Sequence, residues 1–207
     1  MRDTNEALDA ARQPPSRPLW KNWTMLGRRK AVFVVALLLL PLVGVPAPSK
    51  DVRYEPSPFP VVRAMLELAN VGPNDVVYDL GSGDGRIVIM AAKEYGARGV
   101  GIDIDPELIT ESRANARKAG VESKVQFIEG NMFDADLRPA TVVTLFLHPD
   151  PNLRLRPKLL AELKPGSRIV SYIWDLGDWK PDAERTVDDD KIYFWRVPEP
   201  ARGSAMR

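Results

Sequence analysis

The strongest constraint on the fold is the way apolar runs and helical periods alternate along residues 60–200. Runs with strand character end at glycine or polar residues, and segments with apolar residues three and four apart follow them. The expected strands cover 76–80, 99–104, 125–129, 141–147, 168–173, 185–187 and 192–197, and the expected helices cover 60–70, 87–95, 106–119 and 153–163. This alternation predicts an α/β fold with a parallel sheet covered by helices on both faces. The last two strands flank Asp188-Asp189-Asp190 and predict a C-terminal antiparallel hairpin.

The composition excludes several kinds of functional site. The 207 residues include no cysteine and a single histidine. A disulfide scaffold, a thiolate metal site and a cysteine nucleophile are therefore excluded, and we expect no metal. With 44% hydrophobic and 28% charged residues, the chain can bury a core. The length suits one α/β domain and leaves about 50 residues over.

Those additional residues lie at the N-terminus, where the charge also differs. Residues 1–50 hold 8 Lys+Arg and 3 Asp+Glu, a net charge of +5; of the totals of 29 and 28, the remaining 21 and 25 give residues 51–207 a net charge of −4. Residues 1–30 are polar and contain proline, so we expect a basic, disordered tail. A mildly acidic domain is not suited to gripping phosphate backbones, and we expect no nucleic-acid partner.

A hydrophobic segment follows at residues 31–47. It begins after Arg28-Arg29-Lys30 with an uncharged run, AVFVVALLLLPLVGV, from Ala31 to Val45. As a helix this run would reach about 22 Å, which is short of the roughly 30 Å hydrocarbon core of a bilayer. Pro41 would kink or end such a helix. The segment is the expected point of membrane contact, either as an anchor or as a targeting signal.

Three interpretations of this segment remain open. The basic start and Val45-Pro46-Ala47 resemble a cleaved secretory signal, although Pro48 is a poor residue to follow a cut. An uncleaved anchor, with two tryptophans of the tail near the membrane interface, is the second interpretation, and a helix hairpin packed against the domain is the third. We expect a membrane-associated protein, with an exported or a cytoplasmic one as alternatives. A proline-rich linker over 48–59 then leads to the domain at 60–200.

A glycine loop follows the first expected strand and opens a helix. In the sequence DLGSGDGR, from Asp79 to Arg86, glycines permit positive φ and let a ligand approach the backbone. Asp79 precedes the loop, where a carboxylate would repel a pyrophosphate but tolerate a cation. Asp103, at the end of the second strand, can accept hydrogen bonds from both hydroxyls of a ribose. The combination indicates a cationic nucleoside ligand without phosphates, such as S-adenosylmethionine; the alternative is a structural turn with an ordinary helix cap.

Three motifs, VVYDLGSGDGRIVI, GIDID and EGNMFDADL, resemble the first three motifs of the class I S-adenosylmethionine-dependent methyltransferases. The resemblance covers about 55–197 and implies a Rossmann-like, seven-stranded, mostly parallel sheet that the terminal hairpin closes. The stretch RYEPSPFPVVRAMLELA and the N-terminal hydrophobic segment are similar to the lysine methyltransferases of the ATP synthase c-subunit and the adenine nucleotide translocase. LRLRPKLLAELKPGSRIVSYIWDLGDWKPD is nearer to the bacterial relatives of that group.

The resemblance also implies an activity and the residues that serve it. The implied activity is methyl transfer from S-adenosylmethionine to a protein side chain, with lysine as the nitrogen acceptor and membrane proteins among the expected partners. The carboxylate before the glycine loop and the loop itself would hold the methionine portion, the second carboxylate the ribose, and the motif after the third strand the adenine. The implied cofactor-binding residues are Tyr54, Asp79, Gly81, Ser82, Gly83, Asp103, Asn131 and Met132.

Three side chains are candidates for the acceptor site, although the reaction requires no dedicated base because the methyl group is already activated. An acceptor should lie at the carboxyl ends of the fourth and fifth strands. There His148 could accept a proton or orient the acceptor, and Trp174 could line a lysine channel. Glu55 could steer a lysine. The alternatives are, in the same order, a loop histidine, a core aromatic and an exposed linker charge.

Other functions remain open at this point. A nucleic-acid amino-methyltransferase would often have Asn/Asp-Pro-Pro-aromatic after the fourth strand, where this chain has His148-Pro149-Asp150-Pro151. A small-molecule methyltransferase would usually carry a larger lid late in the sheet, for which the chain has little room. A non-enzymatic binding module that keeps the cofactor fold is the third possibility.

Overall fold

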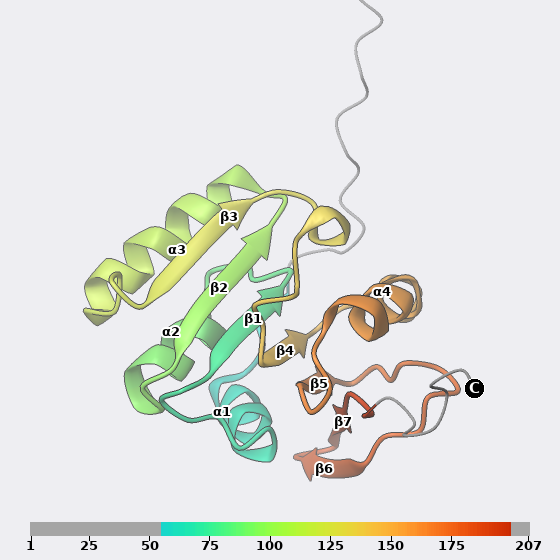
Figure 1. The fold of residues 1–207 in the computed structure, drawn as a ribbon. Helices are drawn as coiled ribbons and strands as arrows, with labels where there is room; N and C mark the ends of the chain where they lie inside the picture. The colour runs from blue at the N-terminus through green and yellow to red at the C-terminus, as the bar shows by residue number, and fades with distance from the viewer. Residues whose placement is uncertain (1–54, 200–207) are drawn as a thin grey trace, which may run out of the picture. The chain divides into compact units, whose positions relative to one another are not determined.

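Seven strands form one sheet in the computed structural model, which describes residues 55–199 (Figure 1). The strands are β1 (Val76–Leu80), β2 (Arg98–Asp103), β3 (Val125–Glu129), β4 (Val142–Leu145), β5 (Arg168–Tyr172), β6 (Ala183–Val187) and β7 (Asp190–Arg196). Their spatial order is β3-β2-β1-β4-β5-β7-β6; the first five are parallel, and β7 is antiparallel to both β5 and β6. The expected Rossmann-like sheet with a C-terminal antiparallel hairpin is confirmed.

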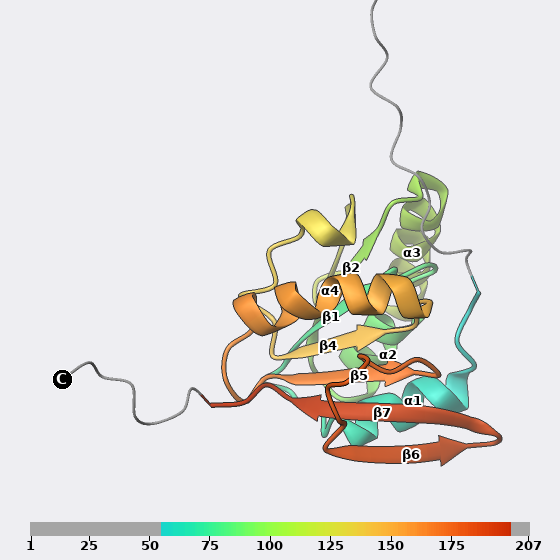
Figure 2. The same ribbon diagram turned by 90° about the vertical axis from the view of Figure 1, so that its right-hand side faces the viewer.

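Helices cover both faces of this sheet (Figure 2). On one face lie α1 (Phe59–Leu68), α2 (Arg86–Glu94) and α3 (Pro106–Ala119), and on the other lies α4 (Pro149–Glu162). The buried apolar residues accordingly form two clusters, one between the sheet and α1–α3 and the other between the sheet and α4. Each face of a parallel sheet must be covered in this way because its strands are apolar on both sides.

Local signals set the bounds of α3, which are those expected. The Asp105 carboxylate accepts a hydrogen bond from the Glu107 amide (3.0 Å), and Pro106 occupies the first helical turn. Gly120 ends the helix at φ 74°, a conformation that glycine adopts at little cost. These are short-range effects, so the sequence alone is sufficient to predict them.

The start of α4 differs from the expectation. The helix begins at Pro149 rather than at Leu153, and His148 occupies the N-cap position. Proline suits the first helical position because its φ is already helical and it lacks an amide hydrogen that would go unpaired. The segment His148-Pro149-Asp150-Pro151 is therefore a helix start and not a loop. A short 3-10 helix, η2 (Met132–Asp134), was also not expected.

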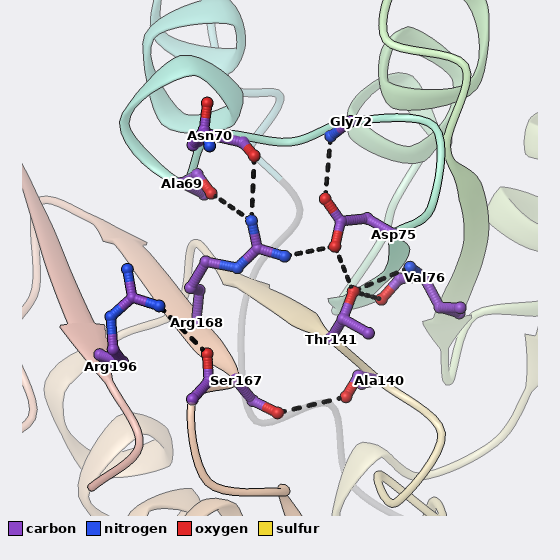
Figure 3. A network of polar contacts seen from close by, with 11 residues as sticks. Ala69, Asn70, Gly72, Asp75, Val76, Ala140, Thr141, Ser167, Arg168 and Arg196 are labelled. Atoms are coloured by element: carbon purple, nitrogen blue, oxygen red, sulfur yellow. Dashed lines mark hydrogen bonds and ion pairs between the residues drawn. The ribbon is translucent and has the colours of Figure 1, made fainter.

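A partly buried ion pair joins the amino-terminal ends of β1 and β5 (Figure 3). Arg168 pairs with Asp75 and also donates to two carbonyls at the end of α1 (2.8 and 3.0 Å). Asp75 accepts further hydrogen bonds from Thr141 Oγ1 (2.7 Å) and the Gly72 amide (2.8 Å). Burial raises the pKa of Asp75, but these bonds and Arg168 outweigh burial, so the net pKa lies below its ordinary value. The network ties α1 to the sheet.

Several expectations concern residues outside 55–199. The basic tail (1–30), the hydrophobic segment (31–47), most of the linker (48–59) and Tyr54 all lie there. Within the described residues, no helix has both the length and the apolar character needed to cross a membrane. The same part of the chain brings together no group of three or more His, Cys, Asp or Glu side chains that could hold a metal.

Candidate active site

A cavity opens at the carboxyl ends of the parallel strands, around the end of β1. β1 lies between β2 and β4, and the chain changes direction across the sheet at this point, which is where open α/β sheets bind ligands. The walls come from the segment before α1, the glycine loop after β1, the end of β2, the turn after β3 and the end of β4. The lining residues include Glu55, Pro56, Ser57, Asp79, Gly81, Ser82, Arg86, Asp103, Asn131, Met132, Phe146 and Leu147.

The glycine loop forms one wall of the cavity in a backbone conformation that side chains rarely adopt. Gly81, Gly83 and Gly85 have φ of 82°, 52° and 82°. The amides of Gly81 and Ser82 both donate to the Ile102 carbonyl (2.8 and 3.0 Å), so the loop is held against β2. Ser82 Oγ is buried in the cavity wall and finds no hydrogen-bond partner within residues 55–199. Such an unpaired hydroxyl is costly and fits a wall that receives a polar ligand.

Asp79 is the buried carboxylate of the site. Its side chain is 3% exposed and accepts a hydrogen bond from Thr144 Oγ1 on β4 (2.7 Å). Burial raises the pKa of Asp79 to about 7; the bond from Thr144 opposes this rise, and the charges of Asp103 and Asp84 add to it. A carboxylate in this position is stabilised in its charged form by any cation that enters the cavity.

Asp103 is the second carboxylate of the cavity, and the backbone holds it in place. One of its oxygens accepts from the Gly83 amide (2.8 Å) and the other from the Asp105 amide (2.9 Å). An ionised carboxylate has about four acceptor positions, so two remain for a ligand. Two acceptors in one plane suit a pair of neighbouring hydroxyls, as a ribose presents.

Arg86 connects the glycine loop to the segment before α1. Its guanidinium pairs with Asp84 (2.7 Å) and donates to the Ser57 carbonyl (2.8 Å), and it lies 5.0 Å from the centre of the Phe59 ring. These contacts hold the segment that carries Glu55 at the edge of the cavity. They also explain why a large residue follows the glycine loop, where a dinucleotide-binding motif has a small one.

Asn131 and Met132 line the cavity beyond β3. Asn131 Oδ1 accepts from the Phe133 amide (3.0 Å) and so caps η2. A carbonyl oxygen has two lone pairs, so one acceptor position remains.

The acceptor candidates occupy two different places. Glu55 lines the cavity, whereas His148 and Trp174 are exposed residues that follow the cavity residues Phe146 and Leu147 and the end of β5. The rings of His148 and Trp174 form a tilted pair with centroids 6.3 Å apart. Trp174 is 36% exposed and is therefore not a core aromatic. Neither ring is among the residues that line the cavity, and we call the His148–Trp174 pair the rim; Glu55, by contrast, lies in the cavity wall.

Sequence reasoning missed two polar residues that serve the site. Thr144 supports Asp79 from the neighbouring strand, and Asn152 on α4 donates to the carbonyl of Trp174 (3.1 Å). Both are fully buried. A lone threonine inside the apolar run VVTLFL is a signal that could have identified the first, because buried polar groups need partners. Asn152 stands in a polar stretch and gives no such signal.

Comparisons with known proteins show the family of this chain. The family of the ANTKMT methyltransferase domain matches residues 79–183. A protein-lysine N-methyltransferase of Saccharolobus islandicus (strain REY15A) is 48% identical over 153 residues, which are 72% of this chain and 95% of the relative. The adenine nucleotide translocase lysine N-methyltransferase of Mus musculus is 33% identical over 197 residues, 94% of this chain and 85% of the relative.

A solved structure is also closely similar. The crystal structure of an RNA methyltransferase from Salinibacter ruber in complex with S-adenosyl-L-homocysteine has 53% sequence identity and a TM-score of 0.70, covering 70% of this chain and 95% of that one. The family match spans half of the chain, and the relatives are matched over most of their own length. The chain therefore belongs to the ANTKMT methyltransferase family, and it is a methyltransferase.

Proposed function

We propose that this methyltransferase uses S-adenosylmethionine, bound in the cavity around β1, to methylate lysine side chains of proteins. The observation that carries the cofactor assignment is the pair of carboxylates on either side of the glycine loop, buried Asp79 and backbone-tethered Asp103. Two carboxyl groups in one cavity disfavour a phosphate-bearing ligand and favour one with an ammonium group and free ribose hydroxyls.

Each part of the cofactor has a matching group in the chain. Asp79 binds the ammonium of the methionine portion, next to the backbone of the glycine loop and the free Ser82 hydroxyl. Asp103 binds the two ribose hydroxyls with its remaining acceptor positions. Asn131 and Met132 flank the adenine, and the segment before α1 that Arg86 holds covers the ligand from the other side.

The chain must bring a neutral amine to the methyl group and keep water away. S-adenosylmethionine supplies a methyl group that its sulfonium already activates. Glu55 attracts the protonated lysine towards the cavity, and His148 accepts the proton that the amine has to lose. Trp174 contacts the cationic side chain with its ring face. A less polar surrounding lowers the pKa of the lysine and so raises the neutral fraction.

The lysine acceptor is supported by the relatives, two of which carry lysine methylation in their names. The name of the Salinibacter protein supports RNA as the second candidate. Two features of this chain favour protein. Residues 51–207 carry 21 basic and 25 acidic side chains, a net charge of −4, which suits a basic protein segment better than a phosphate backbone. The end of β4 leads into His148 and Pro149, not into an Asn/Asp-Pro-Pro-aromatic motif.

A labelling experiment tests the proposal. The full-length protein is incubated with methyl-labelled S-adenosylmethionine and a fractionated lysate of a strain that lacks it, and the label is followed into protein, RNA and small metabolites. We expect label in protein, on lysine by mass spectrometry, and none with the Asp103→Ala variant. Label confined to RNA or to metabolites would refute the lysine acceptor, and failure of the folded protein to bind S-adenosylmethionine would refute the cofactor assignment.

Membrane attachment through residues 31–45 is a further part of the proposal. It rests on the uncharged run AVFVVALLLLPLVGV after three basic residues, with export and a cytoplasmic location as the alternatives. The protein acceptors then include membrane proteins. Replacement of Leu38 and Leu39 by aspartate should move the full-length protein from the membrane to the soluble fraction, since each charge costs about 2.5–3.5 kcal/mol in the middle of a bilayer. Equal fractionation of both forms would contradict this assignment.

A further inference from the structure

β5 ends in a strained turn beside the rim. Ile173, the residue after the strand, has φ of 68°, and the Trp174 amide closes a three-residue turn onto the Tyr172 carbonyl (2.9 Å). A positive φ is rare for a β-branched residue and costs on the order of 1–3 kcal/mol, and a three-residue turn with positive φ at its central residue is strained. Such a conformation persists only where surrounding contacts impose it, so the contacts that hold this turn need to be identified.

A buried polar network supplies those contacts. Ser171 Oγ donates to the Trp174 carbonyl (2.5 Å). The side-chain amide of Asn152, on α4, donates to Ser171 Oγ (3.3 Å) and to the carbonyls of Trp174 and Asp175 (3.1 and 3.2 Å). Asn152 and Ser171 are both fully buried. A single amide group from the helix therefore binds the two carbonyls that follow the strained residue.

The orientation of the Asn152 amide follows from its surroundings. Two carbonyl oxygens face its nitrogen, and an oxygen in that place would be repelled by both. Its own oxygen finds no hydrogen-bond donor within residues 55–199. A buried amide whose acceptor oxygen is unpaired costs free energy, and an apolar side chain at position 152 would avoid that cost. Only the donor half of Asn152 is used, and it is used on the turn.

Asn152 is also linked to the other rim residue. Its backbone amide donates to the carbonyl of His148 (3.3 Å), the N-cap of α4, one helical turn earlier. The same residue thus contacts His148 through its main chain and Trp174 through its side chain. The rings of these two residues lie 6.3 Å apart at an interplanar angle of 43°.

We propose that Asn152 is a positioning residue, which holds the strained turn at Ile173 so that Trp174 stands opposite His148 as an aromatic rim for the acceptor side chain. The inference rests on the proposed function, since the rim serves a cationic side chain with an alkyl stem. Trp174 offers the ring face for such a cation, and the contact weakens steeply when the ring moves. Loss of the Asn152 donor should therefore weaken acceptor binding and leave the cofactor cavity unchanged.

Two variants of the full-length protein test this role. Asn152→Asp keeps the shape of the side chain and removes at least one of its two donor hydrogens, and both when the carboxyl is ionised, and Ser171→Ala removes the hydroxyl bond without introducing a charge. Asn74→Asp, in an exposed turn, is the matched control for the change of amide to carboxylate. The protein is labelled with 5-fluorotryptophan, and Trp174→Phe identifies the Trp174 signal. We expect the Trp174 fluorine resonance to shift or broaden in both variants, while the signals of the other four tryptophans stay in place.

Kinetics give the second readout. With Nα-acetyl-lysine methylamide as acceptor, we expect KM for the acceptor to rise about tenfold in both variants, with kcat changed less than threefold and the Kd for S-adenosylmethionine unchanged. An unmoved Trp174 resonance in both variants would overturn the inference, as would an unchanged acceptor KM. If the wild type binds the cofactor but never methylates lysine, the proposed acceptor is wrong, and the fluorine spectra still decide whether Asn152 places Trp174.

Discussion

Asp79→Asn should stabilise the ligand-free protein at neutral and alkaline pH while it impairs cofactor binding. Burial raises the pKa of the Asp79 carboxyl from 3.8 to about 7. A carboxyl with a raised pKa binds its proton more tightly in the folded state than in the unfolded one. The contribution of the Asp79 carboxyl to the unfolding free energy is therefore fully present below pH 3.8 and is lost as the pH rises through about 7. The asparagine variant does not titrate and avoids this loss.

The size of the effect follows from the two pKa values. With 3.8 in the unfolded and about 7 in the folded protein, ionisation of Asp79 costs ~1.7 kcal/mol of unfolding free energy at pH 5 and ~4 kcal/mol at pH 8. An amide oxygen can still accept the bond from Thr144 Oγ1, but the added amine group has its own desolvation cost. That cost does not depend on pH. The stability difference between variant and wild type should thus shift in favour of the variant by ~2.5 kcal/mol between pH 5 and pH 8.

Urea denaturation of both full-length proteins at pH 5 and pH 8 measures this difference. Asp189→Asn, an exposed residue in the turn between β6 and β7, changes the net charge equally and serves as the control. Calorimetric titration with S-adenosylmethionine should show weakened binding for Asp79→Asn alone. A stability difference that is the same at both pH values would refute the argument that burial raises the pKa of Asp79.

Three further substitutions test other parts of the structure. Arg168→Met breaks the ion pair of Figure 3 and should lower the unfolding free energy by ~3 kcal/mol in urea, because it leaves the buried Asp75 carboxylate without a counter-charge. A loss below ~1 kcal/mol would contradict this. Gly85→Ala places a methyl group 2.6 Å from the Phe127 ring and should lower the unfolding free energy by well over ~1 kcal/mol. Gly120→Ala, which is also at positive φ but has no atom within 4 Å of the added methyl group, should lower it by about 1 kcal/mol in the same assay. Equal losses would contradict the steric argument. Arg86→Ala releases the segment before α1 and should weaken the binding of S-adenosylmethionine, measured by calorimetry, about tenfold. The melting temperature is the control for folding. An unchanged affinity would show that the bond from Arg86 to the Ser57 carbonyl is not needed for cofactor binding.

The elements that local chemistry specifies were predictable. β1, β3 and α3 have the bounds expected from apolar runs, the Asp105 cap and the terminating Gly120. α4 begins at Pro149, before the expected Leu153, because proline suits the first turn of a helix and does not mark only loops. Short-range signals identify an element well and its end less well, since one residue type can serve both sides of a boundary.

The supports of the site could not be predicted, because they join residues far apart in the chain. Thr144 is 65 residues from Asp79, Arg86 is 29 residues from Ser57, and Asn152 is 22 residues from the Trp174 carbonyl. Hydrogen bonds of this kind depend on which strands and helices pack together. Periodicity and spacing carry no information about such a pairing.

The sequence by itself determined the order of strands and helices, the positive-φ loop that only glycines allow, and the two acidic residues at the ends of β1 and β2. The tertiary structure decided the burial, the pKa and the hydrogen-bond partners of those acidic residues. It buries Asp79, which raises the pKa of that carboxyl, and it tethers Asp103 to two backbone amides. It also sets His148 and Trp174 ring to ring at the rim. The physical reason is that residue type is a local property, whereas burial, charge state and orientation depend on groups that only the folded chain brings together.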